Sequence, residues 1–365
     1  MSISEKVKYI ALPKPVALVA ASVVAACMAS SGFSAHVGGL GFVKRAFNDF
    51  ASPEEKMNAV KAYRLRRAIL YHMLHYRVSP YEYFMFGFPE LDDAGKQEFI
   101  GSKECWAVLS RVGTPASREI FNNKYKADLR FCDFYKREAV PILSDKDLEA
   151  FLTFVSKHDR AIVKDLSGLR GAGVFMLDLR APDFNAEKSF RDLLVKGPHI
   201  VEELIRQAPE MAIFHPASVN TVRYETWCEN GRVTPMISFI RMGRGGSVVD
   251  NAGAGGVFAS VDVKSGVVKT GGITEHGQRY DVHPDSGAAI KGFQIPRWEE
   301  LTTIAELAAK SVPEQPCVAW DFALSDDGWV IVEGNARGQF VQQMCEQKGC
   351  RREIEEIIGK DRFRI

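Results

Sequence analysis

Two apolar runs separated by a short acidic turn place the strongest constraint on how this chain can fold. The runs are Val318–Leu324 and Trp329–Glu333, and Asp326–Gly328 lies between them. Short runs of this kind, bounded by a turn with glycine, are typical of a β-hairpin. A three-residue turn pairs residue 321 with residue 333, and both positions carry a carboxylate inside an otherwise apolar strand.

These carboxylates predict a metal site. Asn335 follows Glu333 by two residues, so both side chains point to the same side of the strand. With Asp321 they bring three hard oxygen ligands together, which suits Mg²⁺. A surface hairpin with scattered acids is the alternative, but carboxylates are costly to bury without a cation or a partner. The burial argument therefore favours the metal.

A glycine-rich loop predicts a phosphate site. Lys164 ends a short apolar strand that begins at Ala161, and the loop Ser167–Gly173 follows it. Glycines let backbone amides approach phosphate oxygens, and a lysine supplies a positive charge. The spacing matches neither a Walker motif nor a Rossmann turn, and an ordinary glycine-rich hairpin is the alternative.

Three further features suggest ligand contacts. Glu202 and Glu203 end an apolar strand and could bind a ribose while the backbone reads the adenine edge; solvated acids at a helix start are the alternative. Arg223 enters a strand of Thr, Val and Tyr, so we expect it to point into a polar site. The segment 241–256 is rich in glycine, which indicates either close backbone approach to a ligand or a flexible loop.

Composition narrows the class of protein. The chain has 365 residues and a formal net charge of +1, so we expect no nucleic-acid partner. Its seven cysteines form no CxxC pair, which argues against disulfides and zinc and favours a cytoplasmic protein. Strand and helix signals together predict an α+β fold with largely antiparallel sheets and a helical N-terminal region.

The N-terminal region carries two signals. Ser52–Glu55 forms a capping box and predicts a helix that runs to about Tyr76. Residues 15–33 contain no formal charge and are rich in Ala and Val, which fits a membrane helix, a signal peptide or a buried helix. Association with the inner face of the cell membrane through this segment is a further option.

The motifs as an ordered set resemble the ATP-grasp superfamily, and within it the sugar-transfer-associated branch. The resemblance covers about Leu109–Gln343. It rests on the segments 215–223, 241–262, 283–287, 292–296, 319–323 and 332–335. It implies an ATP-grasp fold, in which two α+β subdomains clasp ATP, and divides the chain into a helical region at 1–108, an N-terminal grasp part at 109–208 and a C-terminal part at 209–365.

The resemblance also implies roles for individual residues. Lys124 and Lys164 would contact the nucleotide phosphates, and Asp321, Glu333 and Asn335 match the magnesium ligands. The lid over the phosphates would include Ser167, Gly168, Gly171 and Gly173, and the adenine and ribose hinge would be Glu202, Glu203 and Leu204. Arg223 resembles an arginine near the transferred phosphoryl group, so the expected catalytic residues are Arg223, Lys164 and Arg241. Candidate substrate contacts are Asn220, Arg241, Arg244, Asp250, Asn251 and His283.

The implied activity is an ATP- and Mg²⁺-dependent ligation of a carboxylate to an amine or thiol through an acylphosphate. The substrates would be small molecules, with a sugar or amino-acid precursor of a surface polysaccharide as one option. A small-molecule kinase, or a non-catalytic nucleotide-binding partner of glycan-assembly enzymes, is the alternative. The proline-rich stretch that usually follows the asparagine in this superfamily is absent at Ala336–Gln339. The chain therefore departs from the usual pattern at the substrate end of the site.

Overall fold

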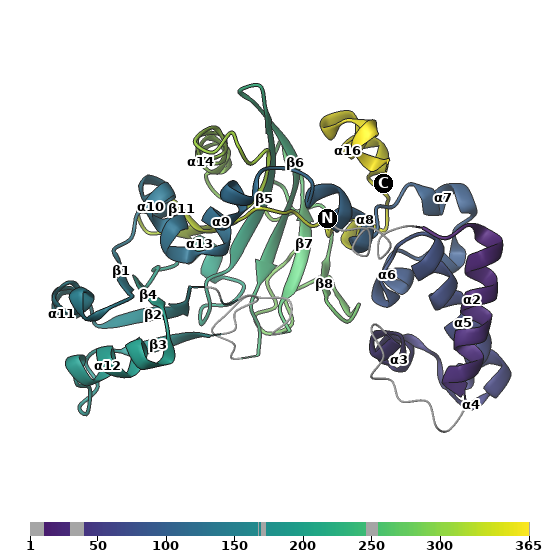
Figure 1. Ribbon diagram of the computed structural model, residues 1–365, viewed down its shortest axis with the longest axis horizontal. Helices are drawn as coiled ribbons and strands as arrows, with labels where there is room; N and C mark the ends of the chain where they lie inside the picture. Colours follow the sequence, from purple (N-terminus) through teal and green to yellow (C-terminus); the bar gives the residue numbers. More distant parts are fainter. Residues whose placement is uncertain (1–10, 30–39, 167, 169–172, 246–254, 365) are drawn as a thin grey trace. The chain divides into compact units, whose positions relative to one another are not determined.

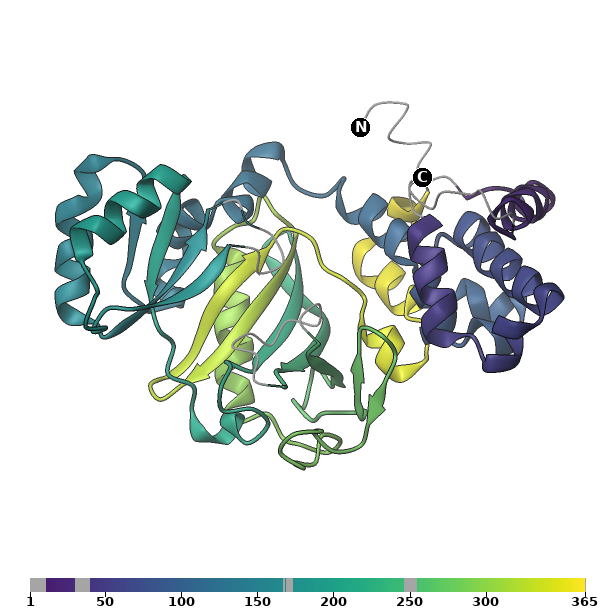
Figure 2. The ribbon, with the colours of Figure 1, turned by 90° about the horizontal axis from the view of Figure 1, so that it is seen from below.

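The computed structural model describes residues 11–29, 40–166, 168, 173–245 and 255–364. The chain divides into two compact units, which we describe separately. Unit 1 comprises Met1–Arg111, His276–Arg279 and Gln339–Ile365, and unit 2 comprises Val112–Glu275 and Tyr280–Gly338. Figure 1 and Figure 2 show a helical unit 1 and a unit 2 built on two sheets. The predicted α+β class with a helical N-terminal region is confirmed.

Unit 1 is built from short helices around an aromatic core. Its helices are α2 (Lys14–Ala29), α3 (Leu40–Phe50), α4 (Pro53–Met57), α5 (Ala59–His75), α6 (Pro80–Met85), η1 (Phe88–Glu90), α7 (Asp93–Gln97), α8 (Ser102–Leu109), α15 (Gln342–Glu346), α16 (Arg351–Ile358) and η4 (Lys360–Phe363). In α2, Ala17, Ala21 and Ala25 are fully buried at four-residue spacing, and α2 packs on α5. No helix among the described residues has the length and hydrophobicity that a membrane crossing needs.

The expected single helix from Ser52 to about Tyr76 is wrong in one respect. The capping box of Ser52 and Glu55 is present, but the helix is interrupted at Asn58, whose backbone is extended (φ −98°, ψ 112°). The Asn58 side chain instead accepts hydrogen bonds from the amides of Val60 and Lys61, so it caps a second helix, α5. Asparagine competes for backbone amides in this way because its side chain is short and polar.

The C-terminal residues of the chain belong to the helical unit. Gln343 anchors them, since its side chain accepts a hydrogen bond from the Ile100 amide (2.9 Å) and donates one to the Ile100 carbonyl (3.0 Å). Arg351 adds a buried ion pair with Glu104. Residues 339–365, which the sequence places with the C-terminal grasp part, therefore pack with the N-terminal helices.

The first sheet of unit 2 is antiparallel and has the order β1-β4-β2-β3. Its strands are β1 (Ala139–Ile142), β2 (Arg160–Asp165), β3 (Val174–Asp178) and β4 (His199–Glu203). Helices α11 (Leu148–Lys157) and α12 (Ala186–Lys196) cover one face, where Phe151, Phe154 and Phe190 pack on Val163 and Val201. Because strand side chains alternate, Lys164 and Glu202 lie on the opposite face.

The second sheet has seven strands in the order β11-β10-β5-β6-β7-β8-β9. The strands are β5 (Thr221–Glu229), β6 (Arg232–Met242), β7 (Val257–Val261), β8 (Gly272–Thr274), β9 (Arg279–Tyr280), β10 (Cys317–Ser325) and β11 (Gly328–Asn335). Helices α9 (Pro115–Asn122), α10 (Lys124–Tyr135) and α14 (Trp298–Lys310) pack on one face, and Trp320 is fully buried beneath them. The other face carries the alternate residues of β5, β6 and β10, which include Arg223 and Asp321.

Candidate functional site

The register of the β10–β11 hairpin sets the acidic side of the site. Asp321 pairs with Glu333, as the sequence predicts. The turn, however, is one residue shorter than expected, since Ser325 pairs with Gly328, and a β-bulge between Asp321 and Phe322 restores the register. Without this bulge, Glu333 would move off the position opposite Asp321 and point to the other face of the sheet.

Two arginines neutralise Asp321. Arg223 on β5 forms a two-bonded ion pair with it, Nε to Oδ1 at 2.6 Å and Nη2 to Oδ2 at 2.7 Å. Arg241 on β6 adds a contact from Nη2 to Oδ2 at 3.0 Å and donates from Nε to the Thr221 hydroxyl. Burial alone would raise the pKa of Asp321, but the two guanidinium groups outweigh it and lower that pKa to about 2. Asp321 is therefore an anion held by two cations.

Glu333 behaves in the opposite way. Burial, together with the negative charge of Asp321, raises the pKa of Glu333. The two carboxyl groups therefore interact, and the ionisation of one depends on that of the other. Asn335 donates from Nδ2 to Glu333 Oε1 at 3.4 Å. Within the described part of the chain, Glu333 and the Asn335 amide are thus the groups of the predicted metal set that form no ion pair with an arginine.

The cationic side of the site lies on the four-stranded sheet and at the start of α10. Lys164 Nζ contacts Glu202 Oε2 at 2.8 Å. Lys124 Nζ donates to the backbone carbonyls of Asp165 (2.9 Å) and Gly168 (2.7 Å). Burial, with a contribution from the nearby Lys164, lowers the pKa of Lys124, and the charge of Glu333 opposes that shift. The two lysines predicted to bind phosphate are therefore neighbours of each other and of Glu333.

The glycine-rich loop is described only at its edges. Ser167 and Gly171 lie outside the described residues, while Gly168 donates its amide to Asp165 Oδ1 at 3.1 Å. Gly173 has φ +73°, and a Cβ there would stand 3.0 Å from the Asp165 Cβ. This position favours glycine for both reasons. The loop thus begins and ends against Asp165, directly after Lys164.

Glu202 links the lysine to a residue that the sequence analysis missed. Its Oε2 accepts hydrogen bonds from Lys164 Nζ (2.8 Å) and from Arg137 Nε (2.7 Å). Arg137 also donates to the carbonyls of Ile331 (2.7 Å) and Val332 (2.9 Å), at the bulge that sets the register of Glu333. Burial alone would raise the pKa of Glu202, but Arg137 and Lys164 lower it to about 2.

The model of the family described as sugar-transfer associated ATP-grasp matches residues 142–358. The chain belongs to this family. The resemblance stated from the sequence is thus confirmed, and no curated protein sequence matches the chain.

Several solved ATP-grasp-type structures are similar in outline. D-alanyl-alanine synthetase A from Vibrio cholerae has 11% identity and a TM-score of 0.41, with 67% of this chain and 63% of that chain covered. D-alanine–D-alanine ligase from Bacillus anthracis has 12% identity and a TM-score of 0.41, with 74% and 76% covered. N5-carboxyaminoimidazole ribonucleotide synthetase from Thermotoga maritima has 11% identity and a TM-score of 0.39, with 68% and 52% covered. The chain thus spans less than two thirds of the Vibrio protein, and the assignment rests on the family match.

The residues predicted to form the adenine and ribose hinge lie at the end of β4. Glu203 donates its amide to the Glu138 carbonyl (2.8 Å), and its carboxylate accepts from the Glu138 amide (3.1 Å). The Glu202 carboxylate is occupied by Lys164 and Arg137, as described above, and Leu204 follows directly after the strand, half-buried. Adenine and ribose contacts at these residues stay predictions.

The predicted substrate contacts fall into three groups. Asp250 and Asn251 lie outside the described residues. Asn220 and His283 are fully buried and support the turn at Gly243: Asn220 Oδ1 accepts from its amide (3.1 Å), and His283 Nε2 contacts its carbonyl (2.8 Å). Arg244, next to that turn, donates from Nη1 to the hydroxyl of Tyr280 (2.8 Å). Direct contacts between these residues and a substrate therefore stay predictions. In the described geometry, Asn220 and His283 hold the backbone of Gly243.

Local sequence contains no signal that would have identified Arg137. It stands in the stretch Lys136–Glu138 between α10 and β1, which resembles an ordinary charged loop. Its partners are 65 residues away at Glu202 and 194 residues away at Ile331. Its guanidinium lies 4.6 Å from the ring centroid of Tyr135. Only the tertiary structure reveals this residue as a bridge between the two sheets of the ATP-grasp unit.

Proposed function

We propose that this chain is an ATP- and Mg²⁺-dependent ligase that joins a carboxylate to an amine or thiol through an acylphosphate. Membership of the ATP-grasp family and the layout of unit 2 support this proposal. The observation that carries it is the pairing of Asp321 with Glu333 beside Lys124 and Lys164. Two lysines that neutralise phosphate charge next to carboxylates that hold a cation are the parts that phosphoryl transfer needs.

The residues fit a divalent cation. Among the described residues no group of three His, Cys, Asp or Glu side chains could hold a metal, so any site here must use the Asn335 amide or ligand oxygens. Mg²⁺ accepts such a set, because it keeps waters and takes phosphate oxygens as ligands. Burial and the charge of Asp321 raise the pKa of the Glu333 carboxyl group, so a bound cation would offset the cost of its negative charge.

The chain's own residues would divide the work as follows. ATP and Mg²⁺ supply the phosphoryl group and its charge neutralisation when bound. Lys124 and Lys164 would hold the phosphates, with Lys164 exchanging its contact with Glu202 for a phosphate oxygen. Glu202 would then keep Arg137 as its partner and remain an anion. Arg223 and Arg241, already fixed on Asp321, would orient the acceptor carboxylate by their remaining donors.

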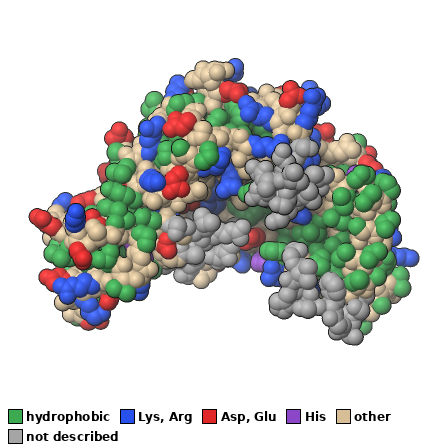
Figure 3. Space-filling model, in the orientation of Figure 1, with side chains coloured by type: hydrophobic (Ala, Val, Ile, Leu, Met, Phe, Trp, Pro, Cys, Tyr) green, Lys and Arg blue, Asp and Glu red, His purple; other side chains and the backbone are tan. Residues whose placement is uncertain are grey.

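The proposal extends to the class of the acceptor and to the place in the cell where the protein acts. The family's description as sugar-transfer associated favours a sugar-linked acid or amine, such as a polysaccharide precursor. Helix α2 supports association with a membrane face or with glycan-assembly enzymes, since Val16, Val19 and Val23 are exposed on the side away from α5. Figure 3 shows hydrophobic side chains gathered over this part of unit 1.

The proposal is tested by turnover and binding with a matched pair of variants. Purified protein is incubated with Mg-ATP and a pool of uronic acids, nucleotide sugars and amino acids, and ADP and inorganic phosphate are measured together. We expect acceptor-dependent release of both, lost in Glu333→Gln and kept in Glu149→Gln, an exposed acid on α11. ADP release without free phosphate would identify a kinase. Failure of the wild type to bind Mg-ATP in calorimetry would overturn the proposal.

A further inference from the structure

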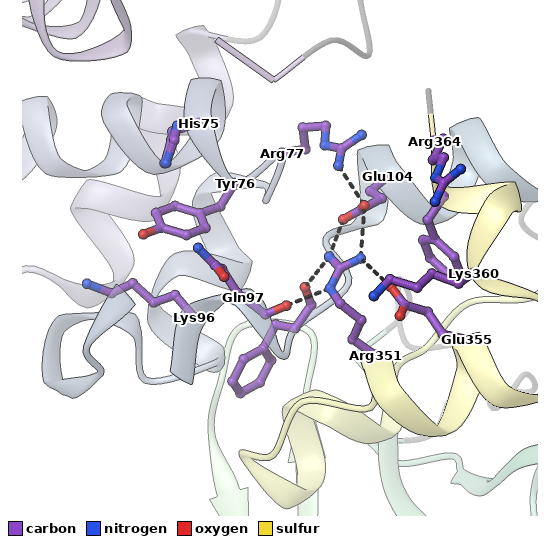
Figure 4. Close-up of a pocket in the computed structure, with 12 residues that line it drawn as sticks. His75, Tyr76, Arg77, Lys96, Gln97, Glu104, Arg351, Glu355, Lys360 and Arg364 are labelled. Carbon is purple, nitrogen blue, oxygen red and sulfur yellow. Dashed lines mark hydrogen bonds and ion pairs between the residues drawn. The ribbon is translucent and has the colours of Figure 1, made fainter. Parts of the chain in front are cut away.

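A second polar site lies within unit 1, and none of its residues belongs to the candidate site of unit 2. A pocket of about 420 Å³ is lined by the C-terminal end of α5, by α7 and α8, and by α16 and η4. Figure 4 shows these residues converging from N-terminal and C-terminal segments of the chain. Its volume lies within the range of small-molecule sites. All of its lining residues belong to unit 1.

The floor of the pocket is a buried and rigid ion cluster. Glu104 is 1% exposed and is held by two arginines. Arg77 Nη2 lies 2.6 Å from Glu104 Oε1, and Arg351 Nη2 lies 2.7 Å from Glu104 Oε2. Arg351 also donates to the Phe99 carbonyl at 3.0 Å. Glu355 adds a second carboxylate, 3.7 Å from Arg351 Nη1, so the two arginines of the floor are balanced by two glutamates and any excess positive charge comes from the rim.

Arg77 carries two features that point to a ligand. Its Nε is buried and has no hydrogen-bond partner among the described residues. Its backbone is left-handed, with φ 60°, although it follows the end of α5, where glycine or asparagine would adopt that conformation at lower cost. Backbone strain of this kind concentrates at functional sites, and a buried guanidinium donor without a partner is costly, so both features single out Arg77 within the pocket.

The rim carries the excess positive charge of the pocket. The lining includes Lys96, Lys360 and Arg364 besides the two floor arginines, against only Glu104 and Glu355. Within the described part of the chain, the side chains of Lys96 and Lys360 make no hydrogen bond or ion pair, and Arg364 pairs with an exposed Asp361. Figure 4 shows Lys96 on one side of the Arg351–Glu104 pair and Lys360 on the other. The excess of positive charge therefore extends along the length of the pocket.

We propose that this pocket binds a small ligand with a multiply charged phosphate, of which diphosphate is the minimal unit. A single carboxylate would leave most of the basic side chains unpaired, whereas phosphate oxygens accept several charge-assisted hydrogen bonds at once. The rings of Tyr76 and Phe363, which also line the pocket, offer contact to an apolar or planar group attached to the phosphate. The phosphate could belong to a soluble metabolite or to a lipid headgroup. This site is separate from the proposed ligase site and does not depend on it.

The test uses rim lysines, because removing a floor arginine could unfold the unit. Binding of inorganic pyrophosphate to the full chain is measured by calorimetry without Mg²⁺. We expect Lys96→Ala and Lys360→Ala each to weaken binding about fivefold, as the loss of one exposed charge contact implies, with multiplied effects in the double variant. Lys348→Ala removes an exposed lysine outside the pocket and should leave binding unchanged. Lys164→Ala should also retain binding, which separates this pocket from the nucleotide site.

Each outcome decides the proposal. Binding of pyrophosphate that is lost only in Lys164→Ala, or binding of citrate with the same affinity as pyrophosphate, would overturn the proposal. If the wild type does not bind pyrophosphate, the proposal is kept only when a second experiment, with lipid vesicles, shows binding. In that experiment, the protein is sedimented with phosphatidylcholine vesicles that contain a polyprenyl diphosphate. Vesicle binding that the double lysine variant loses assigns the phosphate to a lipid headgroup. Vesicle binding that the double variant keeps, without pyrophosphate binding, excludes the pocket.

Discussion

Arg137 provides the most direct test of how unit 2 is held together. Its side chain is 4% exposed and donates to Glu202 and to the carbonyls of Ile331 and Val332. Replacing it by methionine keeps an unbranched apolar stem and removes every donor. Glu202 would keep only Lys164, and the two carbonyls at the bulge would lose their partner.

The size of the effect follows from these contacts. Removing one partner of a buried ion pair costs about 3–5 kcal/mol of unfolding free energy. The remaining Lys164 contact reduces this figure, and the unpaired carbonyls, at about 1–3 kcal/mol each, increase it. We therefore expect a net loss of about 3–5 kcal/mol. For a unit of this size, each kcal/mol lowers the melting temperature by about 2–4 °C, so Arg137→Met should melt roughly 6–20 °C below the wild type.

Scanning calorimetry with two further variants makes the prediction specific. Arg191→Met is the matched control, because Arg191 is 70% exposed and pairs with Glu187 on the surface of α12. Such pairs contribute about 0–1 kcal/mol, so this variant should melt within a few degrees of the wild type. Adding Glu202→Gln to Arg137→Met removes the stranded charge, and the double variant should lose less stability than the sum of the single losses. If Arg137→Met and Arg191→Met have the same melting temperature, Arg137 does not join the two sheets as described.

Three other predictions concern single side chains. Lys164→Met should weaken Mg-ATP binding about 10- to 100-fold in calorimetry, the loss of one charge-assisted bond, and an unchanged affinity would contradict a phosphate role. Burial lowers the pKa of His72 to about 4, so its neutral ring contributes stability above pH 6.5 that is lost as the pH falls toward 4. In His72→Phe, the unfolding free energy should fall less between pH 6.5 and pH 4 than in the wild type, by up to about 3 kcal/mol. The same pH dependence in both proteins would refute the burial argument. Gly101→Ala places a Cβ 2.5 Å from the Arg77 carbonyl oxygen and should cost about 1–3 kcal/mol, more than Gly95→Ala, whose nearest atom is a side-chain oxygen at 3.2 Å; equal urea midpoints would contradict this.

The α+β class, the family and the main residues of the candidate site were predictable because their signals are local. A turn with glycine between two apolar runs predicts a hairpin, and the period of a strand then brings Asp321, Glu333 and Asn335 to one edge. Lys164 before a glycine-rich loop is likewise a short-range pattern. Strand period and turn chemistry act over a few residues, so they can be read without the rest of the chain.

The tertiary structure decided what these residues contact. The bulge between Asp321 and Phe322, rather than the turn alone, sets the register of Glu333. Asp321 is neutralised by arginines on two other strands, and Arg137 joins sheets that are far apart in sequence. These interactions depend on which distant groups share a buried, low-dielectric space, where an unpaired charge is costly. Burial and pairing of that kind arise only when the whole unit is folded, so no local pattern could have shown them.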